Sequence, residues 1–354
     1  MKKSIKAQMT LLVLSSAALI LGLVETYSYV NTRQMILKTG QSIATHLTRS
    51  MTRRIEQEFR AVEKLPQSLS VFMSISPVRD TSKFKSLMVN LVHENPELFA
   101  SGLFFEPTGE GRMTPGVTPY AFRKKDGIEY AQLAGSGYAY LEKQFYILPK
   151  VLNCPVWSDP YFDKGGGNIP MATYSVPLYR PGLRDKAQGF YGVATADISL
   201  KWLTEFTRSV RSGKTGFSFI ITRTGLFVVH PDESLIHGES IFSLADKHNS
   251  SKLRAIAIKM IREEQGFLPI GPVLAGEDAY LAWDEISCSG WILGTVVAKK
   301  ELFRELDLLK QRSIGICIAG LVLLLGASLG VARSLSRPLV DMAATTRRDC
   351  QGDA

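Results

Sequence analysis

The chain has few residues of the kinds that bind metals. Its 354 residues include 4 cysteines and 5 histidines. They form no C-x-x-C pair and no close histidine pair, so we expect no dedicated zinc site. No H-E-x-x-H motif is present, and the glycines at 165–167 are not followed by G-K-[ST], which excludes a phosphate loop of that type. We therefore expect no catalytic residue, no metal and no cofactor.

Two of the cysteines, Cys154 and Cys288, fall in the large central part of the chain. They could pair in an oxidising compartment. Because they lie in what we identify below as different lobes, two free buried thiols are the favoured interpretation and a disulfide is the alternative.

Positive charge is in excess but thinly spread. Of the formal net charge of +9, the lysines before residue 9 contribute +3, residues 333–354 contribute +1 and Glu25 contributes −1, which leaves +6 on the central segment. This excess forms no Lys/Arg stripe with interleaved aromatic residues. Nucleic acid is therefore not expected as a partner.

Two long apolar stretches, residues 9–24 and 313–332, enclose almost the whole chain. Each approaches the ~20 apolar residues that a helix needs to cross a bilayer, so both are predicted to be transmembrane helices. A cleaved signal peptide is the alternative for the first, but no A-x-A-like site follows it.

The short flanks of both stretches are basic, and such flanks stay in the cytoplasm. The basic residues are Lys2, Lys3 and Lys6 before the first stretch and Arg333, Arg337, Arg347 and Arg348 after the second. We therefore predict a bacterial inner-membrane protein with two passes, both termini cytoplasmic and roughly 280 residues outside.

A long amphipathic helix is predicted to follow the first span. Apolar residues recur at spacings of three, four and seven at Ile36, Ile43, Leu47, Met51, Ile55, Phe59, Val62 and Leu65. Pro66 marks the predicted end of this helix. The charged residues on its other faces, Glu56 and Glu58 among them, are interpreted as solvated.

The remaining external segment divides into two blocks. In the first, a helix at 83–93 precedes predicted strands at 103–105, 138–141, 171–179 and 189–195, and a helix at 200–210 closes it. The second has two strands joined at Thr224-Gly225, a helix at 250–264, and strands at 279–285 and 291–297 joined by a turn at Ser289-Gly290. A helix at 299–312 then enters the second span. The predicted fold class is α+β with antiparallel sheets.

Two sequence runs resemble the double Cache (tandem PAS-like) sensor domain of bacterial transmembrane receptors. They are P-V-W-S-D-P-Y-F-D-K-G-G-G-N-I-P-M-A-T-Y-S-V-P-L-Y-R at 155–180 and G-V-A-T-A-D-I-S-L at 192–200. After the second span, S-R-P-L-V-D-M-A at 336–343, with Gln351-Gly352-Asp353, resembles the start of a HAMP signal-relay module.

The resemblance implies a long N-terminal helix that carries two PAS-like lobes between two transmembrane helices. The implied segments are the cytoplasmic N-terminus (1–8), transmembrane helix 1 (9–30), stalk helix (31–65), membrane-distal lobe (66–212), membrane-proximal lobe (213–298), exit helix (299–312), transmembrane helix 2 (313–332) and truncated HAMP start (333–354). It also implies a homodimer and a cytoplasmic output module beyond this chain, with a histidine kinase or PP2C-type phosphatase favoured over a chemoreceptor or nucleotide cyclase.

Amino-acid-binding members of that family use an R-x-W-Y run and later Tyr and Asp residues. The implied ligand-binding residues here are Lys143, Phe145, Tyr146, Trp157, Tyr161, Asp163 and Asp197. Arg and Trp of the run are replaced by Lys143 and Phe145, which puts amino-acid specificity in question because a lysine lacks the two-pronged geometry of arginine.

Several of these residues also have purely structural interpretations. Trp157 could fill the core of the lobe, and Asp163 could hydrogen-bond locally in the turn before the three glycines. Asp197 could be the N-cap of the following helix, and Lys143 could be a solvated surface lysine. His230, before Pro231, is interpreted as part of a turn.

The predicted function is that of a receptor which binds a small external solute, an amino acid, amine or carboxylate, in the distal lobe. A receptor that docks a periplasmic binding protein is one alternative. A membrane-anchored enzyme with scattered active-site residues is another, although no motif supports it.

Overall fold

The computed structural model describes residues 5–75, 81–107, 117–180, 189–209, 216–236 and 238–349, with backbone only at 5–10, 81–82, 305 and 331–349. Contacts divide the chain into two compact units. The larger unit is Gln41–Lys299, and the smaller unit combines Met1–Gly40 with Lys300–Ala354.

Helix α1 (Ile5–Ile75) contains Pro66, so the prediction that the stalk helix ends at this proline is wrong. A proline removes one backbone hydrogen bond, but the residues beyond it gain tertiary contacts. Leu69 and Met73 are buried against α2 (Thr81–Glu94) and the first sheet. Burial of these side chains offsets the lost hydrogen bond. Helix α2 agrees with the prediction at 83–93.

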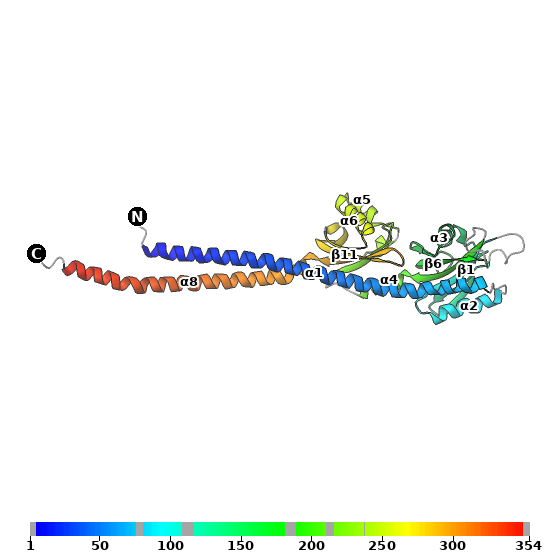
Figure 1. Ribbon diagram of the computed structural model, residues 1–354, viewed down its shortest axis with the longest axis horizontal. Coiled ribbons are helices and arrows are strands. Elements are labelled where there is room, and N and C mark those ends of the chain that lie inside the picture. The colour runs from blue at the N-terminus through cyan, green and yellow to red at the C-terminus, as the bar shows by residue number, and fades with distance from the viewer. Residues whose placement is uncertain are drawn as a thin grey trace. The chain divides into compact units, whose positions relative to one another are not determined.

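The first lobe, which Figure 1 shows around the labels β1 and β6, is built on an antiparallel sheet. Its strand order is β3-β2-β1-β7-β6-β4, with β5 also paired to β6. Its strands are β1 (Ala100–Phe105), β2 (Pro119–Lys124), β3 (Gly127–Gln132), β4 (Val156–Trp157), β5 (Tyr161–Phe162), β6 (Pro170–Tyr179) and β7 (Phe190–Ser199). Helices η1 (Tyr140–Glu142), α3 (Gln144–Leu152) and α4 (Leu200–Ser209) complete it. Strands β2 and β3 were not predicted.

The strand predicted at 138–141 is wrong, because residues 138–139 are irregular, follow a turn at 134–137 and lead into the 3-10 helix η1. Gly135 and Gly137 have φ of 84° and 85°, a left-handed conformation that an extended strand does not use. Tyr138 and Tyr140 are buried in the core of the lobe. Their aromatic character, which suggested a strand, serves packing instead.

The two faces of the first sheet differ, as the alternation of side chains in a strand requires. On one face, Leu103, Leu178 and Ala194 pack against α1 and α2. On the other, Phe104 and Val193 pack with aromatic residues of the loop and of α3. The sheet therefore separates a helix-covered face from a face that holds the candidate site.

The second lobe is a five-stranded antiparallel sheet in the order β10-β11-β12-β8-β9. Its strands are β8 (Phe217–Ile221), β9 (Phe227–Val229), β10 (Gln265–Ile270), β11 (Ala279–Ile286) and β12 (Trp291–Ala298), and its helices are η3 (Glu233–Leu235), α5 (Ile241–Lys247), α6 (Ser251–Arg262) and α7 (Pro272–Ala275). The predicted turns at Gly225 and Gly290 have φ of 84° and 70°. The α+β fold class and these strand pairs are confirmed.

Strand β10 was missed because it contains Gly266 and Pro269, residues that are depleted in strands. Gly266 lies opposite Trp283 of β11. A Cβ atom there would lie 2.1 Å from the Trp283 indole, so only glycine fits. Pro269 is tolerated because β10 is at the edge of the sheet.

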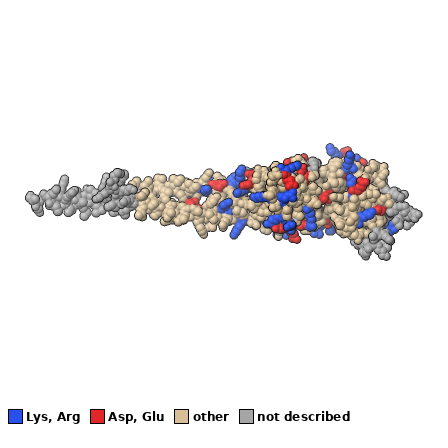
Figure 2. Space-filling view, turned by 90° about the horizontal axis from the view of Figure 1, so that it is seen from above, with Lys and Arg blue, Asp and Glu red and all other residues tan. Residues whose placement is uncertain are grey.

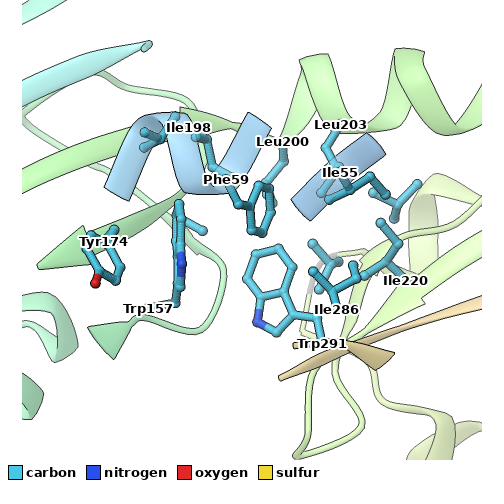
Figure 3. Close-up of a cluster of buried hydrophobic side chains, with 14 of the residues drawn as sticks. Ile55, Phe59, Trp157, Tyr174, Ile198, Leu200, Leu203, Ile220, Ile286 and Trp291 are labelled. Atoms are coloured by element: carbon cyan, nitrogen blue, oxygen red, sulfur yellow. The ribbon is translucent and has the colours of Figure 1, made fainter. Parts of the chain in front are cut away.

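One apolar cluster connects the two lobes (Figure 3). It combines Ile55 and Phe59 of α1, Trp157 of β4, and Ile286 and Trp291 of the second lobe. The prediction that Glu56 is merely solvated is wrong, because its Oε1 accepts a hydrogen bond from Ser287 N at 2.7 Å. Helix α1 is thus bound to the second lobe as well as to the first.

The smaller unit consists of the first part of α1 and nearly all of α8 (Lys299–Asp349). By length and composition alone, the helical segments Leu11–Ile75 and Lys299–Gly330 can each cross a membrane. Ser313 donates a hydrogen bond to Glu25 from the facing helix. The predicted HAMP start at 336–343 is helical, whereas Cys350 and 351–353 lie outside the described residues.

Charged residues of both signs are interspersed on the face of the larger unit that Figure 2 shows. Several form ion pairs, such as Arg254 with Asp246 and Lys150 with Glu106. This distribution agrees with the thin positive excess of the sequence.

Arg123 of β2 is expected to stabilise the end of α2. Its guanidinium donates to the carbonyl oxygens of Leu98 at 2.7 Å, Asn95 at 2.9 Å and Val92. Removal of a charged donor leaves such acceptors unpaired, so Arg123→Ala should lower the free energy of unfolding by about 2–4 kcal/mol. Urea denaturation measures this change. The neighbouring exposed Lys124→Ala is the control, and an equal effect of both substitutions would contradict the assignment.

Candidate functional site

Asp197 lies in the middle of the first sheet and lines a narrow cavity. It belongs to β7 and is paired with Thr173 of β6 and Ala100 of β1. The strand continues to Ser199, so the interpretation of Asp197 as a helix N-cap is wrong. Its side chain is 2% exposed, and Tyr120 Oη donates to Oδ2 at 2.8 Å.

The other carboxylate oxygen of Asp197 is left available. Oδ1 is buried and has no hydrogen-bond partner among the described residues, although the nearby Thr173 hydroxyl favours the charged form. Burial, with a smaller contribution from the negative charge of Asp163, raises the pKa of Asp197 to about 7. A buried carboxylate with a free acceptor oxygen favours a hydrogen-bond donor or a cation as its partner.

The cavity is lined mainly by aromatic rings. Its described lining residues are Phe104, Tyr120, Tyr138, Phe145, Tyr161, Thr173, Thr195 and Asp197. None of these carries a positive charge. The space is too narrow for a water molecule in this conformation, so entry of a solute requires the rings to separate.

Three tyrosine hydroxyls set the polarity of the cavity. Burial, followed by the charges of Asp197 and Asp163, raises the pKa of Tyr120 and Tyr161 well above its ordinary value. Burial also raises the pKa of Tyr138. These hydroxyls therefore stay protonated at neutral pH. Tyr161 Oη and Thr173 Oγ1 are 2.7 Å apart and share a hydrogen bond.

Asp163 holds together the turn that follows β5. Gly167 N donates to its Oδ2 at 2.7 Å, and a Cβ on Gly166 would lie 2.1 Å from the same oxygen. Tyr138 donates to Oδ1, which connects this turn to the cavity wall. Asp163 is not among the described lining residues, so the local-turn interpretation accounts for its contacts.

Lys143 and Tyr146 lie near the cavity without lining it. Lys143 is half-buried just before α3, and its Nζ lies over the Tyr138 ring, 5.7 Å from the centroid. Tyr146 donates to Glu106 and packs edge-on against Phe190. Of the four residues aligned with R-x-W-Y, only Phe145 lines the cavity.

Trp157 lies on the opposite side of the sheet from the cavity. Its ring packs on Phe59 at 4.7 Å between centroids and its Nε1 donates to Glu63 at 2.8 Å. The structure thus places Trp157 in the core, the first of its two interpretations. Burial raises the pKa of Glu63.

Sequence reasoning missed five of the described lining residues, which share the cavity with Phe145, Tyr161 and Asp197: Phe104, Tyr120, Tyr138, Thr173 and Thr195. The alternation of Thr173 and Thr195 with apolar neighbours on β6 and β7 is a signal that was present in the sequence. Tyr120 could not be found in this way, because β2 was not predicted.

His230 has the local role predicted for it. Asp232 N donates to its Nδ1 at 3.0 Å, and the ring packs edge-on against Phe227 at 5.1 Å. Burial lowers the pKa of His230. Cys154, Cys288 and Cys317 are free thiols. Cys154 is exposed and Cys288 is half-buried, so the prediction that both thiols are buried is wrong for Cys154.

Comparison with known proteins agrees with this geometry. Residues 84–205 match the family model described as the first PDC sensor domain of methyl-accepting chemotaxis protein-like proteins. PDC domains are Cache sensor domains. The extracellular domain of mmHK1S-Z3, a candidate histidine kinase, superposes with a TM-score of 0.64 at 19% identity, covering 78% of this chain and 98% of that one.

The chain carries a double Cache sensor fold. The predicted resemblance to the double Cache sensor domain is confirmed. The ligand-binding domain of Mlp24 with asparagine superposes with a TM-score of 0.53 at 19% identity, covering 78% of this chain and 98% of that one. The ligand-binding domain of PctB from Pseudomonas aeruginosa PAO1, in complex with L-Gln, superposes with a TM-score of 0.53 at 16% identity. This match covers 76% of this chain and 98% of that one.

Two curated chemotaxis proteins are also similar in sequence. McpC of Bacillus subtilis (strain 168) is 20% identical over 331 residues, which are 92% of this chain and 44% of McpC. PctB of P. aeruginosa is 27% identical over 171 residues, 46% of this chain and 24% of PctB. The chain therefore spans less than half the length of the curated relatives it matches.

Proposed function

We propose that this chain is the sensing part of a transmembrane receptor and that its first lobe binds a small solute bearing an ammonium group. The observation that carries this proposal is the free Oδ1 of Asp197 inside a cavity of aromatic rings. A carboxylate pairs with an ammonium group, and ring faces attract cations. The chain itself is proposed to have no catalytic activity.

Lys143 supports an amino acid as the solute. Its ammonium lies over Tyr138, which lines the cavity, and we propose that it pairs with the carboxylate of the amino acid. The similar domains of Mlp24 and PctB were solved with asparagine and L-Gln. An amine without a carboxylate would use Asp197 and the rings alone.

Signal relay is proposed to run from the larger unit through α8. Both candidate spans would cross a bacterial inner membrane with the termini in the cytoplasm, and the chain would form a homodimer. The helix at 336–343 would begin a HAMP module that leads to a cytoplasmic output module. Ligand binding can shift such a receptor only by its difference in affinity between two states, typically ~1–3 kcal/mol.

A thermal-shift screen of the full chain in detergent micelles tests the ligand class. Pairs of an amino acid and its decarboxylated amine are compared, together with carboxylates that lack an amine. A ligand at a hundredfold excess over Kd adds about 2.7 kcal/mol, or roughly 5–10 °C. Asp197→Ala should abolish the thermal shift with both members of a pair. Lys143→Ala should reduce only the thermal shift caused by the amino acid. Asp126→Ala, in the exposed β2–β3 turn, is the control.

A protein partner is the second candidate. Ile147, Val151 and Leu152 of α3 are 40%, 73% and 54% exposed, and the first two are one helical turn apart. Together with the narrow cavity, this apolar face favours docking of a periplasmic binding protein. If no solute shifts the melting of a well-folded chain, or if Asp197→Ala leaves every shift intact, the solute proposal is wrong and this candidate replaces it.

A further inference from the structure

Strands β6 and β7 line the cavity with one face. Their other face packs in the apolar cluster that connects the two lobes. Thr173, Thr195 and Asp197 line the cavity, whereas the alternating neighbours Tyr174 and Ala196 belong to the cluster of Figure 3. Two adjacent strands thus form a common wall. A movement of this wall that widens the cavity must also change the packing behind it.

Trp157 is attached to this wall by its backbone. Its strand β4 pairs with β6, with Trp157 opposite Tyr174. The next residue, Ser158, donates from its backbone N to Thr173 O at 2.9 Å and accepts from Thr173 N through Oγ at 3.1 Å. Thr173 lines the cavity. Trp157 is therefore connected to the cavity wall through its neighbour Ser158, which forms both hydrogen bonds to Thr173.

On its other side, Trp157 meets the second lobe. Its ring lies 6.4 Å from that of Trp291 at an interplanar angle of 55°. Phe59 of α1 packs against both, at 4.7 Å from Trp157 and edge-on at 5.6 Å from Trp291. Trp291 begins β12, and α8 follows β12 directly in the chain.

Helix α1 forms hydrogen bonds to both lobes on either side of Phe59. Glu56 accepts from Ser287 N in the β11–β12 turn at 2.7 Å. Glu63 accepts from Trp157 Nε1 at 2.8 Å. With Phe59 between them, these residues have spacings of three and four and therefore share one helix face. The face fixes Trp157 and the start of β12 against the same stretch of α1.

We propose that Trp157 and Trp291 are the positioning residues that couple the cavity of the first lobe to the second lobe. Movement of β6 displaces Trp157, and its ring contact with Trp291 transfers the displacement to β12. The polar contacts of Glu56 and Glu63 keep α1 in place while the rings shift. This inference rests on the proposed receptor function for its purpose, but the coupling itself is a property of the fold that can be measured without a ligand.

Fluorine NMR of the full chain in detergent micelles, labelled with 5-fluorotryptophan, tests the coupling. The chain has four tryptophans. Two lie in the cluster, and two lie elsewhere: Trp202 stacks on Phe206 in α4 and Trp283 is buried in the core of the second lobe. Each resonance is assigned by substitution to phenylalanine. Asp197→Asn then serves as the perturbation of the cavity.

Asp197→Asn should shift the Trp157 and Trp291 resonances by more than their linewidths and leave those of Trp202 and Trp283 in place. In a Trp157→Phe background, the same substitution should no longer shift Trp291. Trp202→Phe is the matched control background, in which the Trp291 response should persist. Retained resonances of the other tryptophans verify that each variant is folded.

Two results would overturn the inference. The Trp291 resonance could be insensitive to Asp197→Asn, or it could respond equally with and without the Trp157 ring. Neither result depends on the identity of the solute. A solute that binds at Asp197 without any response of Trp291 would leave the proposed function standing and remove only this coupling.

Discussion

Asp197→Asn is expected to remove a stability loss of up to about 4 kcal/mol that the protein suffers as the pH rises from 4 to 7. The pKa of Asp197 is raised from 3.8 to about 7 in the folded protein, and one pKa unit corresponds to ~1.4 kcal/mol. Between these two values the folded state binds the proton and the unfolded state does not. Stability from this group is thus fully present below pH 4 and is lost as the pH rises through 7.

The measurement is urea denaturation of both proteins at several pH values from 4 to 8. The difference in unfolding free energy between variant and parent should grow with pH and level off above pH 7. Other titrating groups, such as His230 and Glu63, are common to both proteins and cancel in the difference. Asp126→Asn in the exposed β2–β3 turn is the control. If the difference in unfolding free energy did not change with pH, the pKa of Asp197 would not be raised by burial.

The same titration bears on ligand affinity. Below pH 7 the carboxyl group of Asp197 is largely neutral and pairs less well with an ammonium group. A cationic solute is therefore expected to bind more weakly as the pH falls below 7, and its binding should release a proton. Anionic solutes without an amine should show no such dependence.

Phe59→Ala is expected to destabilise both lobes together. Phe59 is fully buried and packs on Trp157 of the first lobe and Trp291 of the second. Truncation of a buried phenylalanine to alanine costs about 3–5 kcal/mol through lost burial and the remaining cavity. Because both lobes share this side chain, hydrogen exchange should accelerate in strands of both sheets.

Phe72→Ala is a matched control, since Phe72 lies on the same helix but is 47% exposed. Phe72→Ala should lower the free energy of unfolding, measured by urea denaturation, far less than Phe59→Ala does. If Phe59→Ala accelerated exchange in one lobe only, the shared cluster would not act as a single core.

Elements with strong local signals agreed with the prediction. The helix at 83–93 and the strands around Gly225 and Gly290 have clear periodicity or turn glycines and form as expected. The predicted end of α1 at Pro66 was wrong, because Leu69 and Met73 pack against residues that are close in space but distant in sequence, and these contacts outweigh the local preference. The strand expected at 138–141 was wrong for a related reason, since its aromatic residues are buried without an extended backbone.

The candidate site could be predicted only in part. The family resemblance pointed to Tyr161, Phe145 and Asp197, which do meet in one cavity. It also pointed to Tyr146 and Trp157, whose side chains lie elsewhere. Tyr120, which donates to Asp197, comes from a strand that was not predicted. Tyr138, which donates to Asp163, comes from a segment wrongly predicted to be a strand.

The sequence by itself determined the two long apolar stretches, the α+β class and the Cache resemblance, because each depends on local composition, periodicity or a contiguous run of residues. Only the tertiary structure decided that Asp197 is buried with one free oxygen among aromatic rings and that Trp157 and Trp291 meet on Phe59. These facts depend on the register of paired strands and on which face of each strand meets α1. Residues 59, 157 and 291 are far apart in the sequence, and only the folded sheets bring them together.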